Sequence, residues 1–98
     1  MAKPPVRDIK LEIKLDDDVA QGVYSNLTVV NHSEAEFVLD FIFIQPQAPQ
    51  AKVRSRVITS PKHAKRLLRA LEENLRRYEE TFGPLPAAEA AAPESDYH

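Results

Sequence analysis

The sequence predicts an α+β fold, in which a four-stranded antiparallel sheet is followed by one long C-terminal helix. Three observations support this prediction. Apolar and polar residues alternate in residues 9–15 and again in 52–59, as they do in half-buried strands. Residues 37–44 form the most apolar run of the chain. Residues 61–82 repeat apolar side chains at spacings of three and four, which is typical of one face of a helix.

The chain has 98 residues, which suffice for one small domain. Most of its eight prolines lie near the two ends or in the connection at residues 45–50. We therefore expect a single ββββα domain at residues 6–84, with flexible tails at 1–5 and 85–98. The second tail is rich in alanine, proline and glutamate, a composition of low complexity.

Each expected strand has its own signal. Residues 9–15 place apolar side chains on one face and charged ones on the other, and an acidic turn follows at Asp16 to Asp18. Residues 23–30 are rich in β-branched side chains. Residues 36–44 are apolar on both faces, so this strand needs a cover on each side. Residues 52–59 return to alternation and complete four strands before the helix.

The helix has clear start and stop signals. Ser60 is suited to cap its first amides, Pro61 fits the first helical position, and Gly83 followed by Pro84 ends it. A helix of this length measures about 33 Å, longer than the strands at about 17–27 Å. Its far end should overhang the sheet, which predicts a homo-oligomer, most simply a two-fold dimer. The expected oligomer contacts are Leu75, Tyr78 and Phe82.

Several chemistries find no support in the sequence. With no cysteine there is no thiolate nucleophile, and the two glycines are too far apart for a phosphate-binding loop. The acidic turn lacks the later glutamate that a calcium loop needs, and no histidine falls into a catalytic triad pattern. We therefore predict a protein that is not an enzyme and has no metal or cofactor. Without a long apolar segment near its start, we expect it to be soluble and cytoplasmic.

Asp40 interrupts the most apolar strand. A buried carboxylate must find a partner or shift its pKa. We expect a structural ion pair with Arg54 or Arg56 of a neighbouring strand, and the sequence leaves the choice between them open.

Basic residues are concentrated in one part of a chain whose net charge is −2. Arg69, Arg76 and Arg77 are expected to pair with glutamates three or four positions away along the helix. Six other cations lie on the last strand or near the start of the helix, where the helix dipole disfavours positive charge. These candidate partner-binding residues are Lys52, Arg54, Arg56, Lys62, Lys65 and Arg66. They could bind an anionic partner, or they could form a solvated face or ion pairs with acidic strands of another subunit.

Two stretches carry a resemblance to a known family. Phe37-Val38-Leu39-Asp40-Phe41 and Ser60-Pro61-Lys62-His63-Ala64-Lys65-Arg66-Leu67 resemble a family of small bacterial and archaeal proteins catalogued as domain of unknown function 3467. The resemblance covers about residues 8–84 and implies no particular activity. The expected plan of four strands and a long helix is also similar to the export chaperone SecB, which is a tetramer that binds unfolded chains. This second likeness concerns topology only, and the chain lacks a second long helix.

The expected function is that of a non-enzymatic, homo-oligomeric binding or scaffold protein. It would engage a polypeptide partner through a sheet edge or an exposed apolar surface, in a chaperone-like manner. The alternative is binding of nucleic acid or another anionic surface through the basic residues, although no base-stacking aromatic residue lies between positions 52 and 77. The sequence leaves the identity of the partner and the size of the oligomer open.

Overall fold

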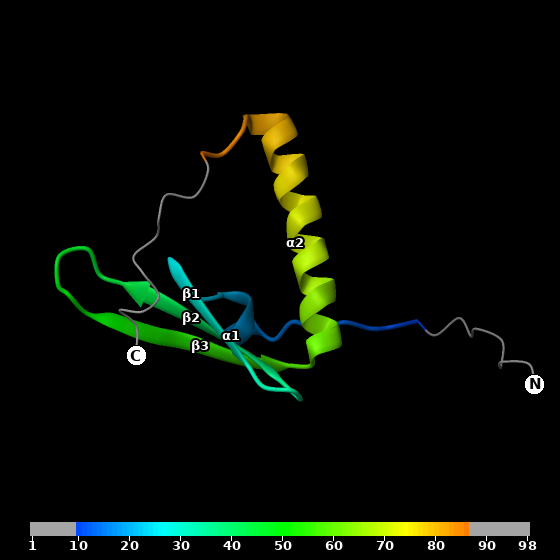
Figure 1. The fold of residues 1–98 in the computed structure, drawn as a ribbon, viewed down its shortest axis with the longest axis horizontal. Helices are drawn as coiled ribbons and strands as arrows, with labels where there is room; N and C mark the ends of the chain where they lie inside the picture. The colour runs from blue at the N-terminus through cyan, green and yellow to red at the C-terminus, as the bar shows by residue number, and fades with distance from the viewer. Residues whose placement is uncertain (1–9, 87–98) are drawn as a thin grey trace, which may run out of the picture.

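Three strands form one antiparallel sheet in the computed structural model, which describes residues 10–86. The strands follow one another in the order β1-β2-β3, and a long helix comes after them (Figure 1). The α+β class with a C-terminal helix is therefore confirmed. The elements are α1 at Asp17–Ala20, β1 at Leu27–His32, β2 at Phe37–Ile44, β3 at Ala51–Thr59 and α2 at Pro61–Phe82. The expected tails at 1–5 and from residue 87 onward lie outside the described residues.

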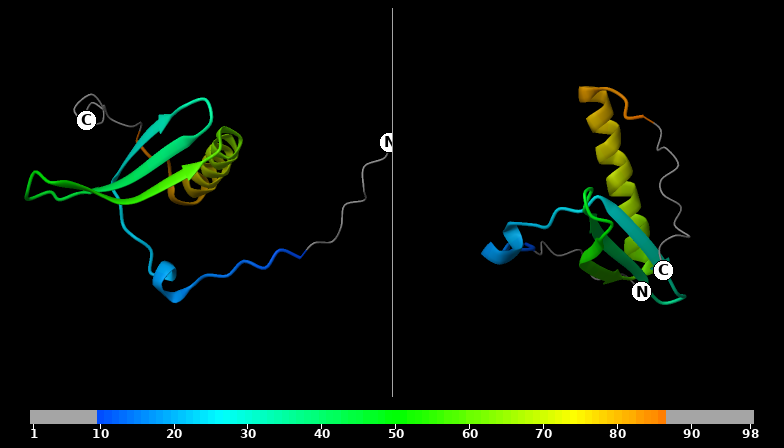
Figure 2. Two further views of the ribbon diagram at one scale, coloured as in Figure 1. Left: turned by 90° about the horizontal axis from the view of Figure 1, so that it is seen from below. Right: turned by 90° about the vertical axis from the view of Figure 1, so that its left-hand side faces the viewer.

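The predicted first strand is wrong. Residues 10–15 have no regular secondary structure, and Leu11, Ile13 and Leu15 are 79%, 82% and 66% exposed. Residues 10–15 lie away from the sheet, and the chain then forms the single turn of α1 before it reaches β1 (Figure 2). An alternating pattern produces a strand only where a neighbouring strand can accept its backbone hydrogen bonds, and none does so here. Within residues 10–86 the sheet therefore has three strands instead of the expected four.

The strand expected at residues 23–30 begins later, at Leu27. Asn26 accounts for this boundary, because its side chain, instead of the backbone of a paired residue, makes the hydrogen bonds to the Ile44 backbone. Its Oδ1 accepts a hydrogen bond from the Ile44 amide at 2.8 Å, and its Nδ2 donates to the Ile44 carbonyl at 3.1 Å. The end of β2 is thereby held where β1 starts.

The buried part of the described chain is small and lies on β1 and β2. Val29, Asp40 and Ile42 are its buried residues, and Ile42 is fully buried. The register pairs Val29 with Asp40 and Leu27 with Ile42, so these side chains share one face of the sheet. Two pairs of cross-strand neighbours thus form the centre of the fold.

Helix α2 begins and ends where the sequence predicts. The Ser60 Oγ accepts a hydrogen bond from the His63 amide at 3.1 Å, and Gly83 leaves the helix at a φ of 99°, which favours glycine. We expected only the far end of α2 to overhang the sheet, but the separation is larger: beyond its first turns the helix rises away from the strands (Figure 1), and none of its residues is buried. Neither α1 nor α2 is long and apolar enough to cross a membrane, in the part of the chain that the structure describes.

Candidate functional site

An apolar groove lies in the corner between the sheet and the start of α2. Its volume is about 570 Å³. The sheet contributes side chains from β1 and β2, and α2 contributes about its first three turns. The groove is lined by Val30, Phe37, Leu39, Pro61, Ala64, Lys65, Leu67, Leu68 and Leu71.

Strand register positions the floor of the groove. Val30 lies opposite Leu39, and Phe37 lies opposite Thr59, the last residue of β3. Thr59 is followed directly by Ser60, which caps α2. Phe37 is therefore held at the base of the helix. The helical spacing of Ala64, Leu68 and Leu71 then turns these three side chains toward the same corner.

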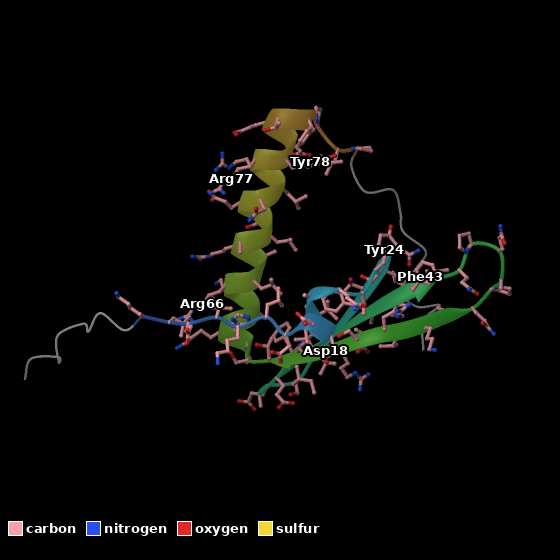
Figure 3. The ribbon with its side chains drawn as sticks, turned by 180° about the vertical axis from the view of Figure 1, so that it is seen from behind. Asp18, Tyr24, Phe43, Arg66, Arg77 and Tyr78 are labelled. Carbon is pink, nitrogen blue, oxygen red and sulfur yellow. The ribbon has the colours of Figure 1, made fainter. Side chains whose placement is uncertain are left out.

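The apolar face of α2 continues beyond the groove as an exposed stripe. We define the apolar stripe as Leu68, Leu71, Leu75, Tyr78 and Phe82, all of which are exposed. Figure 3 shows Tyr78 on the side of α2 that overlooks the sheet, while Arg66 and Arg77 lie on the opposite side. The rings of Tyr78 and Phe82 contact each other with centroids 4.9 Å apart. The stripe thus extends the groove along the whole helix, and it includes the three expected oligomer contacts.

A basic surface adjoins the groove. A hollow of about 440 Å³ is lined by Pro61, Lys62, Lys65, Arg66 and Arg69, and it shares Pro61 and Lys65 with the groove. Within residues 10–86, none of these four cations has an ion-pair partner. The four positive charges repel one another, and Lys62 in the first turn also opposes the helix dipole, so an anion would be favoured there.

The structure brings together only part of the predicted basic cluster. Lys62, Lys65 and Arg66 share this surface, whereas Lys52 lies near the other end of β3, about 23 Å from Thr59 along the strand. Arg54 is the extra residue at a bulge, since Phe41 pairs with Ser55 and Ile42 with Val53. The six cations therefore do not form one site.

Arg69 belongs to the basic surface and was missed at the sequence level. It was expected to pair with Glu73, but Glu73 instead accepts hydrogen bonds from Arg76 at 3.3 Å and Arg77 at 3.0 Å. Arg76 also binds Glu80 at 3.0 Å. Several partners were possible at helical spacing, and the sequence had no signal that ranked them.

Arg56 is bound to Asp40. The Arg56 Nε donates to Asp40 Oδ1 at 2.7 Å and its Nη2 donates to Oδ2 at 2.9 Å, a two-pronged pair across β2 and β3. The Asp40 side chain is 3% exposed and that of Arg56 is 61% exposed. The hydrogen bonds from Arg56 lower the pKa of Asp40 below its ordinary value of 3.8, against the opposing effect of burial. Of the two partners left open by the sequence, the structure has Arg56.

The described residues offer little for metal chemistry. In the range 10–86 there is no group of three or more histidine, aspartate or glutamate side chains that could hold a metal ion. The three aspartates at positions 16–18 lie exposed around α1, and the structure gives their carboxylates no hydrogen bond or ion pair in this range. The groove, the apolar stripe and the basic surface together make up the candidate functional site.

Comparison with known proteins gives one result. No curated protein and no solved structure matches the chain. The likeness to SecB is not confirmed, and the three-stranded sheet removes the four-strand plan on which it rested. The model of the family described as "Protein of unknown function (DUF3467)" matches residues 1–87, so the chain belongs to that family.

Proposed function

We propose that this protein is a non-enzymatic binding protein that assembles with itself and engages an extended, apolar stretch of polypeptide. The observation that carries this proposal is the continuous apolar surface formed by the groove and the stripe. Five large side chains of one helix face remain exposed in the single chain. Soluble single chains seldom expose apolar patches of this kind, and large ones mark interaction sites.

The shape of the surface favours an elongated ligand. The groove runs along α2 from Pro61 to Leu71, about 15 Å at about 1.5 Å per residue. An extended segment of about four to five residues covers this distance, because a strand rises about 3.3 Å per residue. Its apolar side chains would alternate into the groove, as in other proteins that bind extended peptides.

The basic surface adds a charge preference. Lys62 and Arg66 flank the groove, and Lys65 lines both hollows. A bound segment with acidic residues next to its apolar ones would place carboxylates beside these cations. We therefore expect binding of apolar-acidic sequences to be tighter, with faster association at low salt.

A binding assay with an unfolded protein tests the proposal. The probe is a reduced and alkylated protein carrying a fluorophore, and anisotropy reports its binding. We expect Leu75→Gln to weaken binding at least tenfold, because it places a polar amide in the middle of the stripe. Ala70→Gln introduces the same side chain at another exposed position of α2, outside the groove and stripe, and should leave binding unchanged. Equal binding by both variants, or none by the wild type, would contradict the proposal.

The alternative function is binding of nucleic acid or another polyanion to the basic surface. It is favoured by the four cations without ion-pair partners in the described part of the chain. The logarithm of the affinity would then fall linearly with the logarithm of the salt concentration. The double variant Lys62→Gln, Arg66→Gln would make that slope less steep. Polypeptide binding through the stripe would keep most of its affinity at high salt. Salt titrations with a random single-stranded DNA and with the unfolded protein separate the two functions.

A further inference from the structure

The chain contains a segment of the kind that the groove is expected to bind. In residues 11–18, Leu11, Ile13 and Leu15 alternate with polar residues and are followed by three aspartates. These apolar side chains are between 66% and 82% exposed, and the segment has no strand partner in the described structure. The segment therefore combines an exposed apolar face with an acidic end that has no ion pair within residues 10–86.

We propose that residues 11–18 of a second copy occupy the groove, with their aspartates on the basic surface, so that two chains exchange their N-terminal segments in a two-fold dimer. This inference rests on the proposed function, since it names an occupant of the same groove. In a reciprocal exchange both grooves and both segments are occupied, so no site is left to add a third chain.

The charges of segment and groove are complementary. Asp16, Asp17 and Asp18 have no ion pair within residues 10–86, and neither do the four cations of the basic surface. In each molecule the charged group lies directly beside the apolar group. The aspartates follow Leu15 along the chain, and Lys65 lines both the basic hollow and the groove. Docking the apolar residues thus brings opposite charges together.

The strand alternation leaves the other charges of the segment in water. Side chains at successive positions of an extended segment point to opposite sides. When Leu11, Ile13 and Leu15 face the groove, Lys10, Glu12 and Lys14 point away from it. The two lysines therefore do not approach the basic surface.

The size of the contact suits a stable dimer. The segment supplies eight residues, and the groove and basic surface together supply twelve. In a two-fold exchange each chain contributes both sets, which reaches the about 20–30 residues a side of a standard interface. An interface made of one segment in one groove, without the reciprocal contact, would be much smaller.

The path of the chain favours a second copy over the segment's own groove. Residues 10–20 extend away from the sheet and from α2, as both views of Figure 2 show. The segment joins β1 at Leu27, whereas the base of α2 lies beside Phe37 and His32, at the other end of β1. An outward-pointing segment on each chain is positioned to reach a neighbour.

Cross-linking tests the proposal directly, because the chain has no cysteine of its own. Ile13→Cys and Leu67→Cys are made separately, mixed and oxidised. The Cα atoms of a disulfide lie about 4.4–6.8 Å apart, so a covalent dimer of the two variants reports that segment and groove meet between chains. Lys14→Cys is the matched control, since it lies on the other side of the segment, and it should form at least tenfold less of the dimer with Leu67→Cys. Both substitutions are also combined in one chain, and a disulfide that closes only within that chain would overturn the exchange.

Light scattering supplies the second measurement. At micromolar concentration the wild type should have the molar mass of two chains. The double variant Leu11→Ser, Ile13→Ser should have the molar mass of one chain. Both residues are about four-fifths exposed in the single chain, so circular dichroism should show the fold unchanged. Glu12→Ser with Lys14→Ser leaves the net charge unchanged and should preserve the dimer. A wild-type monomer, or a dimer that survives the first double variant, would refute the inference.

The two proposals fail in different ways. The unfolded-protein assay is repeated on the Leu11→Ser, Ile13→Ser variant. If the segment occupies the groove, removing it should tighten binding of the probe at least threefold. If the wild type is a monomer and the double variant binds the probe as tightly as the wild type does, the exchange is overturned and the proposed function stands. A dimer that breaks on mutation but never binds the probe would support the exchange and overturn the proposed function.

Discussion

Strand β2 and helix α2 both carry strong apolar patterns, yet the structure buries one and leaves the other exposed. β2 pairs on both sides and contains the fully buried Ile42, whereas Leu71 of α2 is 55% exposed. A helix satisfies its backbone hydrogen bonds within itself, so it can form without a neighbour, whereas a strand cannot. The apolar side chains of α2 therefore stay exposed in the single chain, whereas those of β2 include the centre of the fold.

The segment at residues 10–15 extends this comparison. It has the alternation of a strand but lacks the neighbour that β2 has on each side. Its apolar residues consequently stay exposed, as do those of α2. Two exposed apolar surfaces in one small chain are what an exchange between copies would cover.

The comparison predicts the largest loss of stability at the centre of β2. Ile42→Ala removes a fully buried side chain and leaves a cavity, so it should lower the free energy of unfolding by about 2–5 kcal/mol. Urea denaturation followed by circular dichroism measures the change. A loss below about 1 kcal/mol would show that Ile42 is not at the centre of the fold.

The next largest effect is expected at Asp40, and it depends on pH. Because the hydrogen bonds from Arg56 lower the pKa of Asp40 in the folded state, the pair stabilises the fold above the ordinary value of 3.8 and loses this effect as pH falls through the lowered pKa. Asp40→Asn should therefore be less stable than wild type at neutral pH, and the difference should shrink in acid. Unfolding is measured from about pH 2 to 7. Glu34→Gln is the control, since Glu34 is exposed, lies outside the groove, the apolar stripe and the basic surface, and makes no ion pair within residues 10–86, so it should show no such difference.

The helix cap should have a smaller effect. Ser60→Ala removes the acceptor of the His63 amide, and loss of such a cap costs about 1 kcal/mol. Ser60→Asp retains an acceptor and should keep most of the stability. Urea midpoints of the two variants test whether the start of α2 depends on this hydrogen bond, and equal midpoints would contradict it.

The smallest effect on the single chain is expected at Leu71. Had the helix packed fully on the sheet, Leu71→Ala would cost about 2–5 kcal/mol. With more than half of its surface exposed, we expect a loss below about 1 kcal/mol when the chain is monomeric. The Leu11→Ser, Ile13→Ser background supplies that monomer. A larger loss in the wild-type background would indicate that a second copy covers Leu71.

The sequence alone determined the elements whose signals are local. The bounds of α2 follow from Ser60, Pro61 and Gly83, and β2 and β3 follow from their apolar and alternating patterns. Each of these signals acts over a few neighbouring residues, so no knowledge of the rest of the fold is needed.

Only the tertiary structure decided which groups meet across the chain. It selected Arg56 as the partner of Asp40, left residues 10–15 without a strand partner, and separated Lys52 from the basic surface. It also formed the groove, where β1, β2 and α2 come together. These outcomes depend on strand register and on the direction in which α2 leaves β3, and pattern within one segment carries no information on either.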